Sequence, residues 1–135
     1  MTLSTQQNLA VSAAAASHLV LIATSTGLFH GFQSAVNAQT PSGDIESELT
    51  TCEATIAENI EPNSVLRREF DLFARTLRTA YSTFAAQAPD NDRTHARTFA
   101  LRTAADAFTR ITTNARAQLV RSIECQADVS MAQAA

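Results

Sequence analysis

The ten arginines are the residues of this 135-residue chain whose type and spacing point most directly to chemistry. The chain has no lysine, and all ten arginines fall between residues 63 and 121. A guanidinium binds phosphate through two parallel hydrogen bonds, and such contacts are independent of nucleotide sequence and weaken as salt is added. Six arginines lie on two predicted helices around Pro89: Arg75, Arg78, Arg93, Arg97, Arg102 and Arg110. They are candidates for phosphate binding; the alternative is a solvated face that pairs with Asp71, Asp90, Asp92 and Asp106.

The cysteines, histidines and acidic residues give no signature of an enzyme or a metal centre. His18 and His30 are twelve residues apart and point to different sides of a helix, so with His95 they form no metal-binding motif. There is no Gly-x-Ser-x-Gly, no phosphate loop and no pair of catalytic carboxylates with a base. Cys52 and Cys125 could form a disulfide, but straight helices would place them far apart, which favours two free, buried thiols. We therefore expect no catalysis, no metal and no cofactor.

Charge is distributed in three blocks that the net charge of −3 conceals. Residues 1–43 contain no Asp, Glu, Lys or Arg, and residues 44–62 contain six acids and no base. Residues 63–121 contain all ten arginines against five acids, a local excess of five positive charges. The chain therefore has an uncharged third, an acidic connector and a cationic half.

The uncharged third allows three interpretations. Residues 9–32 are long enough to span a bilayer, but Ser, Thr and His dilute them and no Lys or Arg flanks them. A secretory signal could end at Val36-Asn37-Ala38, although the positive n-region is missing. The third interpretation is a helix covered on nearly all sides, inside the protein or inside an assembly.

Helical periodicity governs the remainder of the chain. Gly and Pro number three each, which argues against turn-rich β folds. Apolar residues recur every three or four positions, and this spacing predicts helices over about residues 44–61, 66–88 and 93–125. We predict an all-α protein, an antiparallel four-helix bundle that forms a single domain over residues 1–125. Residues 126–135 are small and polar, and we predict a flexible tail there.

Three short segments carry a family resemblance. Gly31-Phe32-Gln33-Ser34-Ala35 ends the uncharged helix, Asn63-Ser64-Val65-Leu66 opens the third helix, and Arg102-Thr103-Ala104-Ala105-Asp106-Ala107 precedes Ile111 and Val120. Together they resemble the coat proteins of rod-shaped plant viruses, the tobamovirus-like family, over about residues 9–125. The chain departs from that pattern because it is shorter, has no Trp, and lacks the strand-like segment of the connector. Tyr81 and Ser82 also stand where the family has arginines.

The resemblance implies bundles arranged radially in a helical rod, with the Pro89 end at inner radius. Arg93, Arg97 and Arg102 would then contact RNA phosphates, and Asp106 would orient an arginine or a ribose hydroxyl. With the two arginines of the third helix, the candidate RNA-binding residues are Arg75, Arg78, Arg93, Arg97, Arg102 and Asp106. The candidate subunit contacts, on the uncharged helix and the acidic connector, are Leu21, Phe29, Phe32, Glu46 and Glu48. Carboxylates that repel each other across such a contact would release it at higher pH.

The leading hypothesis is a non-catalytic structural subunit that assembles with copies of itself into a rod or filament and packages single-stranded RNA. No membrane is expected, and the resemblance implies assembly in a host cytoplasm and residence in a virion. The first alternative is a small secreted helical binding protein that is cleaved after Ala38 and carries a Cys52–Cys125 disulfide. The second is a single-span accessory subunit of a membrane complex.

Overall fold

The computed structural model describes residues 5–38, 42–86 and 93–134, and every element in them is a helix. In chain order the elements are α1 (Thr5–Ala38), α2 (Ser42–Asn59), α3 (Val65–Ala85) and α4 (Arg93–Ala134). This confirms the all-α four-helix bundle that the sequence predicts. Pro89, which marks the end of the bundle predicted to lie at inner radius, is outside the described residues.

The strict apolar period of α3 explains why this helix forms the centre of the core. Its start is fixed by Ser64, whose side chain accepts a hydrogen bond from the Arg67 backbone N–H at 3.2 Å. From there every third or fourth side chain is buried: Phe70, Phe73, Leu77, Tyr81 and Phe84. The amphipathic helix predicted from this spacing is confirmed, although it ends at Ala85 and not at Ala88.

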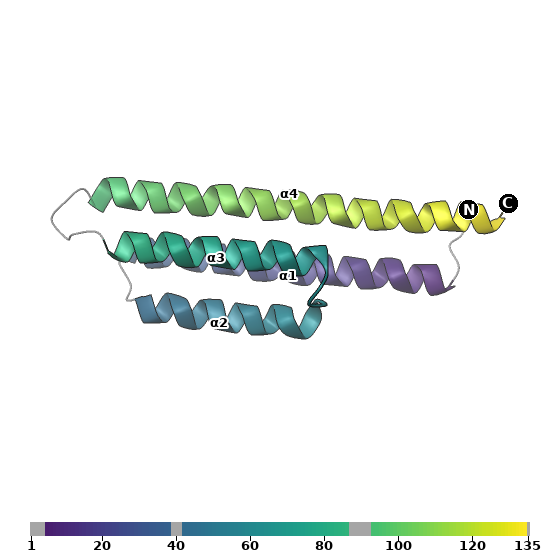
Figure 1. The fold of residues 1–135 in the computed structure, drawn as a ribbon, viewed down its shortest axis with the longest axis horizontal. Coiled ribbons are helices and arrows are strands. Elements are labelled where there is room, and N and C mark those ends of the chain that lie inside the picture. Colours follow the sequence, from purple (N-terminus) through teal and green to yellow (C-terminus); the bar gives the residue numbers. More distant parts are fainter. Residues whose placement is uncertain (1–4, 39–41, 87–92, 135) are drawn as a thin grey trace.

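The four helices pack so that α1 and α3 lie between α2 and α4. Both central helices contact each other and each of the outer two, whereas α2 and α4 make no contact with each other among the described residues. Figure 1 shows this arrangement, with α4 and α2 along opposite sides of the bundle. Because neighbours in the chain run antiparallel, α2 and α4 run in the same direction.

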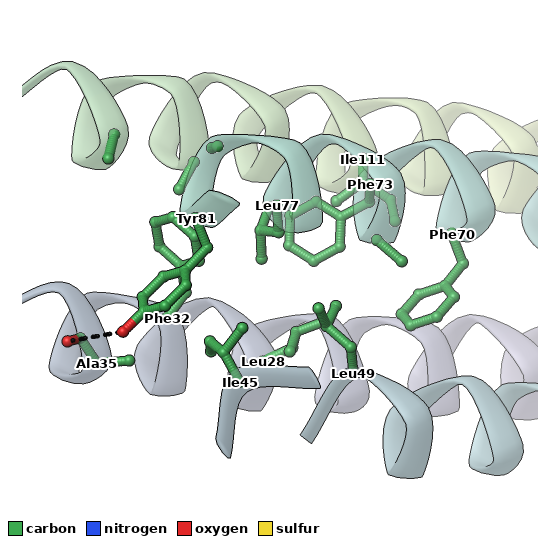
Figure 2. Packing of buried hydrophobic residues seen from close by; sticks show 14 of the residues in the cluster. Leu28, Phe32, Ala35, Ile45, Leu49, Phe70, Phe73, Leu77, Tyr81 and Ile111 are labelled. Carbon is green, nitrogen blue, oxygen red and sulfur yellow. Dashed lines mark hydrogen bonds between the residues drawn. The ribbon is translucent and has the colours of Figure 1, made fainter. Parts of the chain in front are cut away.

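The core is apolar and includes aromatic residues from α1, α3 and α4. The ring of Phe32 meets that of Tyr81 edge-on, with centroids 5.8 Å apart. The Tyr81 hydroxyl donates a hydrogen bond to the Ala35 carbonyl oxygen at 3.5 Å (Figure 2). Phe29 of α1 stacks on Phe108 of α4 at 4.6 Å, which fixes the relative level of these two helices.

Two of the helices are much longer than the other two. At about 1.5 Å per residue, the 34 residues of α1 and the 42 of α4 extend well beyond the 18 of α2 and the 21 of α3. The start of α1 and the end of α4 therefore project past α2 and α3, as Figure 1 shows. We call the part of the bundle that contains this projection, residues 5–20 with residues 113–134, the α1–α4 arm; within it, residues 13–18 and 118–122 still lie beside the α2–α3 connection.

The end of α4 differs from the sequence prediction. The helix continues to Ala134, whereas the apolar stripe predicted an end near Cys125. Residues 126–134 lose that stripe but contain no Gly or Pro and are rich in Ala and Gln, so nothing in them stops a helix. The predicted end at Cys125 is wrong for this reason, and the predicted flexibility of the segment stays a prediction.

Candidate functional site

The arginines predicted to bind RNA do not share one face of the bundle. Arg75 is exposed on α3 and Arg102 is exposed on α4. Arg78 points towards α2, and Arg97 lies on the inner side of α4. The side chain of Arg93 lies outside the described residues. Of the five predicted arginines, two thus offer an exposed guanidinium in the part of the chain where side chains are described.

Arg78 is held by two carboxylates of α2. Its Nε donates to both oxygens of Glu46, at 3.0 and 2.9 Å, and its Nη2 donates to Glu53 at 2.8 Å. The hydrogen bond from Arg78 lowers the pKa of Glu46, and the two carboxylates raise the pKa of Arg78. Arg78 and Glu46 thus pair with each other within one chain while both stay partly exposed, and their predicted roles in RNA binding and subunit contact stay predictions.

Arg97 faces the interior of the bundle. Ala100 and Ala104, three and seven residues further on, are buried on the same side of the helix. Arg97 itself is half-buried, and its Nε is buried without a hydrogen-bond partner among the described residues. The spacing of the arginines alone did not indicate this orientation, and the predicted contact of Arg97 with phosphate stays a prediction.

Asp106 and Arg110 line a shallow groove between α3 and α4. The groove has a volume of about 310 Å³, and Glu69 of α3 stands on its other side. Asp106 is exposed, and its predicted role near RNA stays a prediction. Phe99, which sequence reasoning did not select, is 61% exposed on the same helix. Its exposure could not be inferred from residue type, because the other phenylalanines are buried or half-buried.

Two of the predicted subunit contacts belong to the core of the chain itself. Leu21 and Phe32 are 0% exposed, and Phe29 is half-buried in its stack on Phe108. Leu21 and Phe32 therefore have no surface to offer a second subunit, and their predicted role is corrected. Phe29 keeps only part of its surface for such a contact.

The opposite face of α1 carries the exposed apolar surface. Leu9 and Leu19 are 66% and 67% exposed, and Val120 and Ile123 of the α1–α4 arm are also exposed. The outward stripe of α1 continues with small uncharged residues such as Ala16, and α1 contains no charged residue at any position. Among the described residues α1 is the one helix that could cross a membrane by length and composition, over Leu9–Ala38, a property that core helices and signal sequences share.

Glu48 and Cys52 lie where α2 meets α1. The Glu48 carboxyl packs directly against Gly31, at a position that a Cβ atom would occupy. Burial raises the pKa of Glu48; burial, together with the nearby charges of Glu48 and Glu53, also raises the pKa of the Cys52 thiol. Both cysteines are free, and Cys125 is exposed, so the expectation of two buried thiols is wrong for Cys125.

The polar groups near the base of the arm do not assemble a metal centre. No group of three or more His, Cys, Asp or Glu residues is placed to hold a metal ion within the described ranges. A groove of about 380 Å³ lies between the arm and the α2–α3 connection, and His18 lines it. The Nε2 atom of His18 is buried without a hydrogen-bond partner in the described part of the chain.

Comparison with family models, with curated proteins and with solved structures gave no match to this chain. The resemblance to the coat proteins of rod-shaped viruses therefore stays a prediction that rests on the residues named above.

Proposed function

We propose that this protein is a structural subunit that assembles with copies of itself into a helical rod or filament and packages single-stranded RNA through arginine–phosphate contacts. It acts without catalysis, in the manner of a tobamovirus-like coat subunit. The observation that carries the proposal is the exposed, uncharged face of α1.

That face is unusual for a helix in contact with water. Surface helices normally carry charged residues on the side away from the core, and α1 has none in 34 residues. Leu9 and Leu19 expose about two thirds of their surface on it. A continuous uncharged face with exposed leucines favours burial by another molecule, and a second copy is the partner that is always present at equal concentration.

The secreted and membrane alternatives conflict with the packing of the same helix. Cleavage after Ala38 would remove all of α1, whose buried residues are part of the core: Leu21, Leu28, Phe32, Ala35 and Val36. Insertion of α1 into a bilayer would withdraw the same residues from α3 and α4. Both events would expose the apolar faces against which α1 packs, so retention of α1 is the interpretation that keeps the bundle intact.

The RNA contacts are assigned to the predicted arginines that are exposed, Arg75 and Arg102. An exposed guanidinium can bind a phosphate through two hydrogen bonds without breaking an ion pair, which Arg78 could not do. Arg110, beside Asp106 in the groove between α3 and α4, is a further candidate of the same kind. These contacts would be independent of RNA sequence and sensitive to salt.

Negative-stain electron microscopy of the purified full chain, with and without single-stranded RNA, tests the proposal. We expect rods or filaments, and we expect RNA inside them to resist ribonuclease. Small monodisperse particles at every pH and salt concentration would overturn self-assembly.

The RNA assignment has its own test. Arg75→Gln with Arg102→Gln should weaken RNA protection and flatten its dependence on salt, because two phosphate contacts are removed. Helix content by circular dichroism should be unchanged, since both side chains are exposed. Unaltered protection by the double variant would show that these two residues do not contact the RNA.

A further inference from the structure

Charge is separated between two opposite sides of the bundle. The outer helix α2 contains five acids and no base, whereas α4 contains six arginines against three acids. These two helices are the ones that do not touch each other among the described residues, because α1 and α3 lie between them. One molecule thus presents an acidic side and, facing away from it, a basic side.

The outward positions of each helix carry a matched pair of charges. On α2, Asp44 and Glu58 are exposed, opposite the buried Ile45, Leu49 and Ile56. On α4, Arg102 and Arg116 are exposed on the side away from the core. The two residues of each pair are fourteen positions apart, which is about 21 Å along a helix and nearly a whole number of turns, so both side chains point to the same side of their helix. The four side chains form no ion pair within the described part of the chain.

The two pairs also stand at the same level along the bundle. The stack of Phe29 on Phe108 sets α1 against α4, and the contact of Gly31 with Glu48 sets α1 against α2. Because α1 and α4 are antiparallel, the step of two residues from Phe29 to Gly31 corresponds to the step from Phe108 back to Asp106. Gly31, and with it Glu48, therefore lies at about the level of Asp106 along the bundle. Since α2 and α4 run in the same direction, Asp44 is then level with Arg102, and Glu58 with Arg116. Figure 1 agrees, with α2 alongside the first half of α4.

We propose that the acidic face of α2 in one copy docks on the basic face of α4 in the next copy, with Glu58 opposite Arg116 as the charge pair of the contact and Arg102 left to RNA phosphate. The next copy is therefore displaced sideways from the first by about one bundle width, with little shift along the direction of the helices. Such a contact joins two different surfaces, so it is heterologous and leaves a free acidic face and a free basic face at the ends of the chain of subunits. The inference rests on the proposed self-assembly and specifies the side-to-side contact.

The side chains between the charges allow close approach. The outward stripe of α2 continues through Ser47, Thr51 and Ala54, and that of α4 passes through Thr109 and Thr113. A contact over the length of α2, about 27 Å, by a helix width of about 10 Å covers a few hundred Å² per copy, well below an ordinary stable interface. It therefore sets direction and register, while the uncharged face of α1 supplies most of the buried area.

Reversal of one charge at a time tests this pairing with Glu58→Arg and Arg116→Glu, which leave the RNA candidates untouched. Each variant alone carries like charges on both faces, so we expect its critical concentration for assembly to rise about tenfold. An equimolar mixture should assemble again, because each variant then meets an opposite charge on the other. The matched control is Arg121→Glu, an exposed arginine beyond the level at which α2 ends, and it should assemble like the unmodified chain.

The outcomes separate this inference from the proposed function. If both single variants assemble at the same critical concentration as the unmodified chain, the α2–α4 contact is overturned and the proposed self-assembly is unaffected. Loss in both variants without recovery on mixing would also overturn it, because a direct pair between Glu58 and Arg116 must be restored in the mixture. Failure of the unmodified chain to assemble would overturn the proposed function itself. Glu58→Gln and Arg116→Gln, each expected to raise the critical concentration by a smaller factor, keep the test valid if a reversal lowers helix content.

Discussion

Leu19 and Leu21 are two residues apart on α1, and the structure predicts opposite consequences for their removal. Leu19 is 67% exposed on the outward face, whereas Leu21 is 0% exposed in the core. Burial of a whole leucine is worth about 1.5–3 kcal/mol, so burial of the exposed two thirds of Leu9 or Leu19 in an assembly contributes about 1–2 kcal/mol each. Alanine keeps part of that surface, and Leu9→Ala with Leu19→Ala should lose about 2 kcal/mol of association, roughly a thirtyfold higher critical concentration.

The same double variant should fold normally, with a change in unfolding free energy within about 0.5 kcal/mol, because exposed positions contribute little to folding. Leu21→Ala should instead lower the unfolding free energy by about 2–5 kcal/mol, since it leaves a cavity in the core. Light scattering against concentration measures the first effect, and urea denaturation measures the second. A Leu9→Ala/Leu19→Ala chain that assembles at the original concentration would refute the assignment of the outward face of α1 to subunit contact.

Two further predictions concern the acids of α2. Arg78→Gln should lower the unfolding free energy at neutral pH by about 1 kcal/mol or less, because the ion pairs are partly exposed. The hydrogen bond from Arg78 lowers the pKa of Glu46 from 4.5, so its contribution exists above that value and is lost as pH falls; in urea denaturation the difference from the unmodified chain should shrink as the pH is lowered below 4.5. Glu48→Gln should raise the melting temperature at neutral pH, because burial raises the pKa of this carboxyl and its ionised form destabilises the fold. That gain should vanish below about pH 4.5, where Glu48 is protonated in both states; a gain that is independent of pH would contradict the burial argument.

The helices could be predicted from sequence because their apolar periods are local properties. In α3 the aromatic and leucine residues repeat without interruption, so both the helix and its buried face follow from spacing. In α1 the existence of a helix follows from composition, but its orientation does not. Alanine, serine and leucine occur on all sides of it, and only the packing of Leu28 and Phe32 against α3 and α4 distinguishes the inner face from that of Leu19.

The candidate site was harder to predict because it depends on contacts between distant residues. Arg78 and Glu46 are 32 residues apart, and nothing in the local sequence indicates that they meet. Arg97 and Arg102 are five residues apart, and a shift of five residues turns a side chain by about 140° around a helix. Their similar appearance in sequence therefore concealed that one faces the core and the other faces solvent.

The two faces of α1 place opposite demands on one segment. Its inner face must match the fixed shape of α3 and α4, which explains the large, fully buried side chains such as Leu21 and Phe32. Its outer face would lie against a second copy, and there small residues such as Ala16 and Ala23 let two helices approach, while charge would have to be paired or desolvated. A helix under both constraints loses the polar stripe by which surface helices are normally recognised, and its sequence becomes similar to that of a signal or a membrane span. If the proposed self-assembly holds, the ambiguity of residues 9–32 in the sequence has a physical origin in the requirement that both faces of the helix be covered by protein.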